Sequence, residues 1–142
     1  MIPTLRRAVA SCALLLCIQG CYTGTVAYVR PHAQVQSAPS QILAVVQETV
    51  AAQGLRIVHA RPEEGVVEAV TAPVEMGDLH TRERWRFSVR AGELSVEMHP
   101  ETRPDDDRRW ERDLNVCDCY HYAREREMLR AIRARLRGPR RG

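Results

Sequence analysis

The sequence predicts an α+β domain in which a helix, two β-hairpins and a second helix follow one another, with both helices packed on one face of a four-stranded antiparallel sheet. Three observations lead to this prediction. Apolar residues recur at helical spacing after position 39 and again after position 120, residues 84–99 alternate between polar and apolar side chains, and glycine-containing turns separate these stretches. Helices and hairpins that each bury one face pack as two layers around a shared core.

Composition and length restrict the class of protein further. The 142 residues include 44% apolar side chains, 21 basic residues that are all arginine, and 18 acidic ones, which gives a formal charge of +3. This length accommodates one domain, and the chain is too apolar and too weakly charged to be disordered. A dedicated nucleic-acid-binding domain would carry a larger basic surplus, so nucleic acid is not an expected partner.

The first helix is expected to begin near Pro39 and to end before Gly54, since glycine is favoured just beyond a helix C-terminus. A hairpin follows, in which residues 55–61 and 66–71 are rich in β-branched side chains and flank a turn at residues 62–65. The core-facing side of the helix is predicted to consist of Ile42, Val45, Val46, Thr49, Val50 and Gln53.

The second hairpin is the strongest structural prediction. After a loop near Gly77 and Asp78, residues 84–90 and 93–99 alternate around a turn at residues 91–92. This pattern indicates a sheet with one buried and one solvated face. The residues predicted to point inward are Trp85, Phe87, Val89, Leu94, Val96 and Met98, and those predicted to line the open face are Arg84, Arg86, Arg90, Glu93, Glu97 and His99.

The last helix follows a charged, irregular stretch at residues 101–115. Its core-facing side is predicted to contain Tyr122, Leu129, Ile132 and Leu136, and residues 138–139 (Gly-Pro) end it. The domain is therefore expected to span residues 38–138, with a short basic tail at residues 139–142.

The first twenty residues have the composition of a secretory signal peptide. Two arginines precede an apolar run at residues 8–18, which is too short to cross a membrane. The segment Ile18-Gln19-Gly20-Cys21 resembles the lipobox of bacterial lipoproteins, which has an aliphatic residue three positions before the cysteine and a small residue directly before it. No motif identifies a family for the domain that follows.

This resemblance implies that residues 1–20 are removed and that Cys21 becomes a lipidated N-terminus carrying acyl chains such as palmitate, with the domain in the periplasm. Because Tyr22 rather than Asp follows the cysteine, it implies the outer membrane rather than the inner one. Residues 21–37 would form a tether, in which residues 25–29 could pair as an edge strand. The alternative is an ordinary cleaved signal peptide, with Cys21 as a structural cysteine. The 122-residue mature chain would hold 19 arginines and 18 acidic residues.

Two further cysteines remain in the mature chain, in the sequence Cys117-Asp118-Cys119-Tyr120-His121. In an oxidising envelope they could form a structural or inter-chain disulfide. They could also be inert thiols, a redox pair, or a soft-metal site completed by His121. A single Cys-x-Cys is a weak signal for any of these functions, and the identity of such a metal stays unknown.

No sequence pattern indicates catalysis. The five histidines are scattered, and the chain lacks a His-Glu-x-x-His motif, a Gly-x-Ser-x-Gly elbow and a phosphate-binding glycine loop. We therefore predict no catalytic residue, no enzyme activity and no cofactor apart from the covalent lipid.

The basic residues gather at the C-terminal end. Residues 124–142 contain eight arginines and two acidic residues, whereas residues 21–123 contain eleven arginines and sixteen acidic residues. The simplest interpretation is a solvated helix face. The alternative is contact with an anionic envelope lipid or an acidic envelope protein through Arg130, Arg133 and Arg137. The sequence thus favours a lipid-anchored binding or scaffolding domain, with a metal or thiol-redox protein as the alternative.

Overall fold

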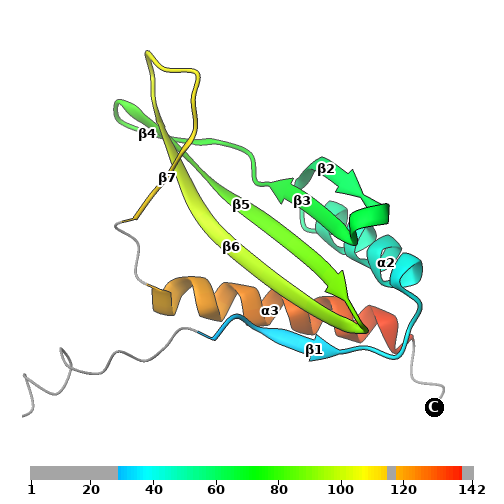
Figure 1. Ribbon diagram of the computed structural model, residues 1–142. Helices are drawn as coiled ribbons and strands as arrows, with labels where there is room; N and C mark the ends of the chain where they lie inside the picture. The colour runs from blue at the N-terminus through cyan, green and yellow to red at the C-terminus, as the bar shows by residue number, and fades with distance from the viewer. Residues whose placement is uncertain (1–28, 115–117, 139–142) are drawn as a thin grey trace, which may run out of the picture.

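The computed structural model describes residues 29–114 and 118–138. Within them one twisted sheet is packed against two helices (Figure 1). The elements, in chain order, are β1 (His32–Gln34), α2 (Pro39–Ala52), β2 (Arg56–Arg61), the 3-10 turn η1 (Pro62–Glu64), β3 (Val66–Val70), β4 (Val74–Met76), β5 (Leu79–Arg90), β6 (Glu93–Pro104), β7 (Glu111–Arg112) and α3 (Asp118–Leu136).

The α+β class is confirmed, but the prediction of a four-stranded sheet is wrong. The sheet contains seven antiparallel strands, in the order β1-β6-β5-β3-β2, with β4 paired to β5 and β7 paired to β6. The two predicted hairpins form four consecutive strands of it, β6-β5-β3-β2, with β2 at one edge. The additional strands arise because β5 and β6 extend over twelve residues each, which leaves free edges at their far end that β4 and β7 cover.

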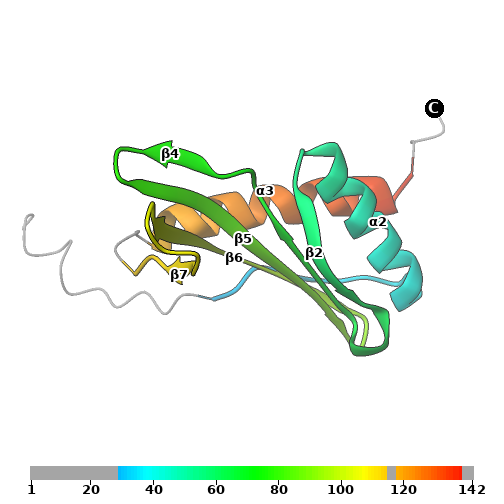
Figure 2. The same ribbon diagram turned by 90° about the horizontal axis from the view of Figure 1, so that it is seen from above.

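Both helices lie on the same face of the sheet (Figure 2). All six residues predicted to point inward from the second hairpin are buried, and Trp85 and Phe87 stack with ring centroids 6.3 Å apart. From α2, Ile42, Val46 and Val50 are fully buried against them. Burying a large apolar side chain stabilises the fold by about 2 kcal/mol, so this layer accounts for most of the driving force.

The buried side of α3 differs from the predicted one. Leu129 and Ile132 are buried as expected, but Tyr122 is 39% exposed. His121 and Glu125 take its place on the inner side, together with Met128. The Glu125 carboxylate is fully buried and accepts a hydrogen bond of 2.7 Å from the Met98 backbone N–H. The short strand β1 pairs only with residues 93–95 of β6, so the Met98 N–H has no neighbouring strand to bond to. The Glu125 carboxylate accepts that hydrogen bond instead.

The segment before α2 also joins the domain. Residues 32–34, which the sequence analysis assigned to the tether, pair as β1 with residues 93–95 of β6. The edge strand expected at residues 25–29 lies outside the described residues except for Val29, which has no regular structure. The domain therefore begins before the predicted residue 38, with β1 at the sheet edge.

Candidate functional site

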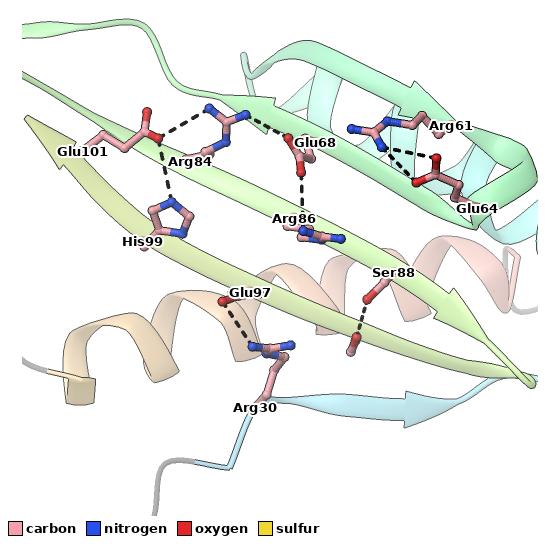
Figure 3. Close-up of polar contacts among 11 residues, drawn as sticks. Arg30, Arg61, Glu64, Glu68, Arg84, Arg86, Ser88, Glu97, His99 and Glu101 are labelled. Atoms are coloured by element: carbon pink, nitrogen blue, oxygen red, sulfur yellow. Dashed lines mark hydrogen bonds and ion pairs between the residues drawn. The ribbon is translucent and has the colours of Figure 1, made fainter. Parts of the chain in front are cut away.

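A chain of charged side chains crosses the open face of the sheet from β3 to β6 (Figure 3). The Arg84 guanidinium lies between two carboxylates: Nη2 is 2.9 Å from Oε2 of Glu68, and Nη1 is 3.4 Å from Oε1 of Glu101. Nη2 of Arg82 lies 2.6 Å from Oε2 of Glu101. Strand register explains this grouping, because Glu101 pairs with Arg82 across β5 and β6 and alternate residues of a strand share a face.

The carboxylates of this network are mostly buried, with 8% of the Glu101 side chain and 12% of the Glu68 side chain exposed. Burial by itself raises the pKa of Glu68, but the hydrogen bond and charge of Arg84, with the charge of Arg86, bring it below its ordinary value. The hydrogen bond to Glu68 in turn raises the pKa of Arg84. Both shifts favour the charged forms of Glu68 and Arg84, so the opposite charges of this pair neutralise each other at neutral pH.

His99 lies beside this network, with Nε2 3.8 Å from Oε1 of Glu101. Burial lowers the pKa of its imidazole, and the charge of Arg112 lowers it further. Its Nδ1 is buried and has no hydrogen-bond partner among the described residues. His99 is thus neutral at pH 7 and adds no positive charge to the open face.

The other residues predicted on the open face are partly neutralised as well. Arg86 lies 3.8 Å from Glu68, Glu97 pairs with Arg30 at 3.1 Å, and Glu93 accepts a hydrogen bond of 3.3 Å from Gln34. Arg90 is exposed and has no ion pair within the described part of the chain. Glu68, Arg82 and Glu101 were not predicted on the open face. Extending the alternation of polar and apolar residues beyond residues 84 and 99 would have indicated Arg82 and Glu101, and the same alternation in residues 66–70 would have indicated Glu68. The open face is thus a largely self-paired surface.

A different situation holds on α3, where Arg126, Arg130 and Arg133 are exposed. Their spacing of four and three residues places them on one side of the helix. Together with residues 29–32 and Tyr122 they line a pocket of about 460 Å³, whose floor is the buried side chain of Leu129. No acidic residue lines this pocket.

The sequence analysis named Arg130, Arg133 and Arg137 as one group. The structure brings Arg130 and Arg133 together in this pocket, whereas Arg137 does not line it. Arg133 and Arg137 share a neighbouring hollow of about 320 Å³ beside Gln34 and Ser37. Arg30 and Arg126 were not predicted, because nothing in the sequence indicates that residues 29–32 run beside α3.

The residues of the thiol and metal hypothesis are only partly described. Cys117 lies outside the described residues, as does Cys21, and Cys119 lies in the first turn of α3. His121 is 5% exposed, and its Nε2 is buried without a hydrogen-bond partner among the described residues. In residues 29–114 and 118–138, no three His, Cys, Asp or Glu side chains lie close enough together to hold a metal ion.

A third hollow, of about 650 Å³, lies where β5 and β6 extend past the start of α3. Val74, Met76 and Leu79 contribute exposed apolar side chains to it. At its inner end Glu83 accepts hydrogen bonds from Arg124 at 2.8 Å and from the indole of Trp85 at 3.1 Å. This carboxylate is satisfied by its own neighbours, so the hollow offers mainly apolar surface.

Comparisons with known proteins identify no family. No family model matches the chain, and no curated protein is significantly similar to it. A solved structure with a similar arrangement is a DUF4468 family protein from Bacteroides ovatus, with a TM-score of 0.46 and 10% sequence identity over 84% of this chain and 92% of that chain. Among the described helices, none is both long and apolar enough to span a membrane.

Proposed function

We propose that this chain is a bacterial envelope lipoprotein, anchored through a lipid on Cys21 at the outer membrane. Its small α+β domain binds a partner and catalyses no reaction. The lipobox-like segment at residues 18–21 and the signal-peptide pattern before it support the anchor. Two or three acyl chains are sufficient for stable attachment, whereas one is not.

One structural observation supports a binding function in particular. On the open sheet face Arg82, Arg84 and Arg86 have carboxylate partners. Arg130 and Arg133 have no ion pair among the described residues and, unlike the isolated Arg90, lie together in a concave pocket. Unpaired arginines in a pocket are free to bind an external anion through their planar, fork-shaped guanidinium groups. The partner is therefore an anionic envelope lipid or an acidic envelope protein, and the binding surface is α3.

The anchor is tested by changing Cys21→Ala in the full chain expressed in a bacterium with two membranes. We expect the variant to leave the membrane fraction, because a diacylglycerol cannot be attached without the thiol. Western blotting of fractionated cells, with Cys119→Ala as the matched control that keeps the anchor, measures this effect. Tight membrane association of the Cys21→Ala chain would show that the lipid is not the anchor.

A second candidate function rests on Nε2 of His121, which is buried and has no hydrogen-bond partner in residues 29–114 and 118–138. An imidazole nitrogen without a hydrogen-bond partner is free to bind a metal, and His121 follows Cys119 by two residues and Cys117 by four. We infer that, if the domain holds a soft metal or a redox-active thiol pair, these three residues form the site.

This second candidate is tested on the purified mature protein by titrating its thiols and measuring its metal content. A metal or redox site predicts bound zinc or copper, or two thiols that appear on mild reduction. Replacing His121 with Ala should then reduce the metal content, while His59→Ala, a change at an exposed histidine, should not. A stable disulfide without metal would exclude the metal site.

A further inference from the structure

The pocket between residues 29–32 and α3 has both a charge and a location that restrict its ligand. Arg126, Arg130 and Arg133 line it from one side of α3, and residues 29–32 line it from the N-terminal segment, where the Arg30 guanidinium is directed to Glu97 on the open sheet face (Figure 3). The ion pair of Arg30 with Glu97, at 3.1 Å, leaves half of the Arg30 side chain exposed. The pocket therefore holds more positive than negative charge, and its ligand is an anion.

The walls of the pocket also contain exposed apolar groups. Val29 is 63% exposed, and Tyr122, whose ring lies 5.3 Å from the Arg126 guanidinium carbon, is 39% exposed. Exposed aliphatic and tyrosine side chains beside arginines are characteristic of protein surfaces that lie at the interface between a membrane and water. A soluble anion would use the arginines but would gain nothing from these apolar groups.

The position of the pocket along the chain favours the same ligand. Only seven residues lie between Cys21 and Val29, which lines the pocket, so eight residue steps join the two. A fully extended chain of that length spans about 29 Å at most. If Cys21 is lipidated, the pocket stays within that distance of the leaflet surface, where lipid phosphates are abundant and their effective concentration is high.

We propose that this pocket binds the phosphate of anionic lipid headgroups in the leaflet that carries the Cys21 anchor. This inference rests on the proposed lipid anchor and identifies the ligand of the proposed binding surface. Bidentate contacts from Arg130 and Arg133 hold the phosphate, while Val29 and Tyr122 contact the region just below the headgroups. The lipid on Cys21 attaches the protein, and the pocket sets the orientation of the domain on the membrane.

The test uses the chain from residue 21 to residue 142 with Cys21→Ser, which carries no lipid and keeps every described residue. Its binding is measured by co-sedimentation with phosphatidylcholine vesicles, with and without phosphatidylglycerol. We expect binding only to the anionic vesicles, and binding that weakens steeply with salt because exposed charges are screened.

The pocket variant is the triple substitution Arg126→Gln, Arg130→Gln and Arg133→Gln. Each arginine near an anionic surface strengthens binding about fivefold, so the variant should bind on the order of a hundredfold more weakly. The matched control, Arg56→Gln with Arg61→Gln and Arg90→Gln, removes the same charge at exposed positions outside the pocket and away from β4 and β7, and should bind almost normally. Unchanged thermal unfolding of both variants verifies that they fold.

Three outcomes would overturn the proposal. The first is equal loss of binding in the two variants, which would mean that only the total charge matters. The second is no preference for anionic vesicles, with inorganic phosphate alone shifting the NMR signals of Arg130 and Arg133. The third is no vesicle binding together with capture of an acidic envelope protein that depends on these arginines. Because this chain carries no lipid, a failure of vesicle binding would overturn the proposed ligand of the pocket but not the proposed anchor. The anchor is tested separately by the fractionation of the Cys21→Ala chain.

Discussion

At the scale of single residues, the centre of the open face depends on carboxylates that share arginines. Glu68 and Glu101 both contact Arg84, and neither carboxylate is free to face solvent fully. Hydrogen bonds to charged groups contribute about 1.5–3 kcal/mol when they are well desolvated, whereas exposed ion pairs contribute about 0–1 kcal/mol. The mostly buried Glu68 belongs between these limits.

The Glu68 carboxylate predicts how stability depends on pH. Its pKa is below its ordinary value in the folded protein, so it stabilises the fold at neutral pH, and this contribution is lost as pH falls through the lowered pKa. We expect Glu68→Gln to lower the free energy of unfolding by about 1 kcal/mol at pH 7 and by much less at an acidic pH below that lowered pKa, where wild-type Glu68 is neutral as well. Urea unfolding at both pH values measures the difference.

Glu64→Gln is the matched control for this measurement. Glu64 also pairs with an arginine, Arg61 at 2.9 Å, but both side chains are about half exposed. An exposed pair contributes little, so this substitution should change stability by less than about 0.5 kcal/mol at either pH. If Glu68→Gln lowers the free energy of unfolding equally at both pH values, the contribution of Glu68 to stability comes from packing and not from its charge.

At the scale of elements, the turn before β3 is where the two hairpins meet. Gly65 has a φ of +68°, and its carbonyl accepts a hydrogen bond of 2.8 Å from the backbone N–H of Val89 in β5. A Cβ at Gly65 would lie 2.4 Å from the Val89 carbonyl oxygen. Only glycine allows both this backbone conformation and this close approach.

Replacing Gly65 with Ala should therefore destabilise the fold for two reasons. A left-handed backbone costs an alanine about 1–2 kcal/mol, and the contact with the Val89 carbonyl adds about 1–3 kcal/mol. Gly54→Ala separates the two effects, because Gly54 has a φ of +77° but no atom within 4 Å of its Cβ position. Thermal unfolding should show a clearly larger loss for Gly65→Ala, and equal losses would contradict the close approach.

The long central hairpin is the element that gives the molecule its shape. β5 and β6 pair along their full length, from Arg90 opposite Glu93 to Leu79 opposite Pro104. Only their lower halves are covered by the helices, while the upper halves project beyond the start of α3 (Figure 1). The projecting part carries β4 and β7, and with them the exposed side chains of Val74, Met76 and Leu79.

At the scale of the whole molecule, the open sheet face and the α3 side differ in how their charged groups are paired. The described large apolar side chains that are exposed gather towards the end where α3 starts, and the first described residues lie there as well (Figures 1 and 2). The open sheet face is polar and largely self-paired, while α3 presents unpaired arginines. If the domain binds a membrane as proposed, the α3 side is the one that would face it, because its arginines are not neutralised by carboxylates of the described residues.

The sequence by itself determined the α+β class, both helices and the two predicted hairpins. Each of these elements buries one side, so its apolar residues recur at a spacing that is visible within a short stretch of sequence. It also indicated the six inward residues of the second hairpin. It missed β1, β4 and β7, because short edge strands depend on which partner lies beside them and have no periodic pattern of their own. Only the tertiary structure decided which arginines are neutralised and which meet in a pocket. Nothing in the sequence distinguishes Arg84 from Arg130. In the structure Arg84 lies between two carboxylates, whereas Arg130 lines a pocket with residues 29–32, about a hundred residues earlier in the chain. The interaction between charges depends on their distance in space, which only the tertiary structure sets.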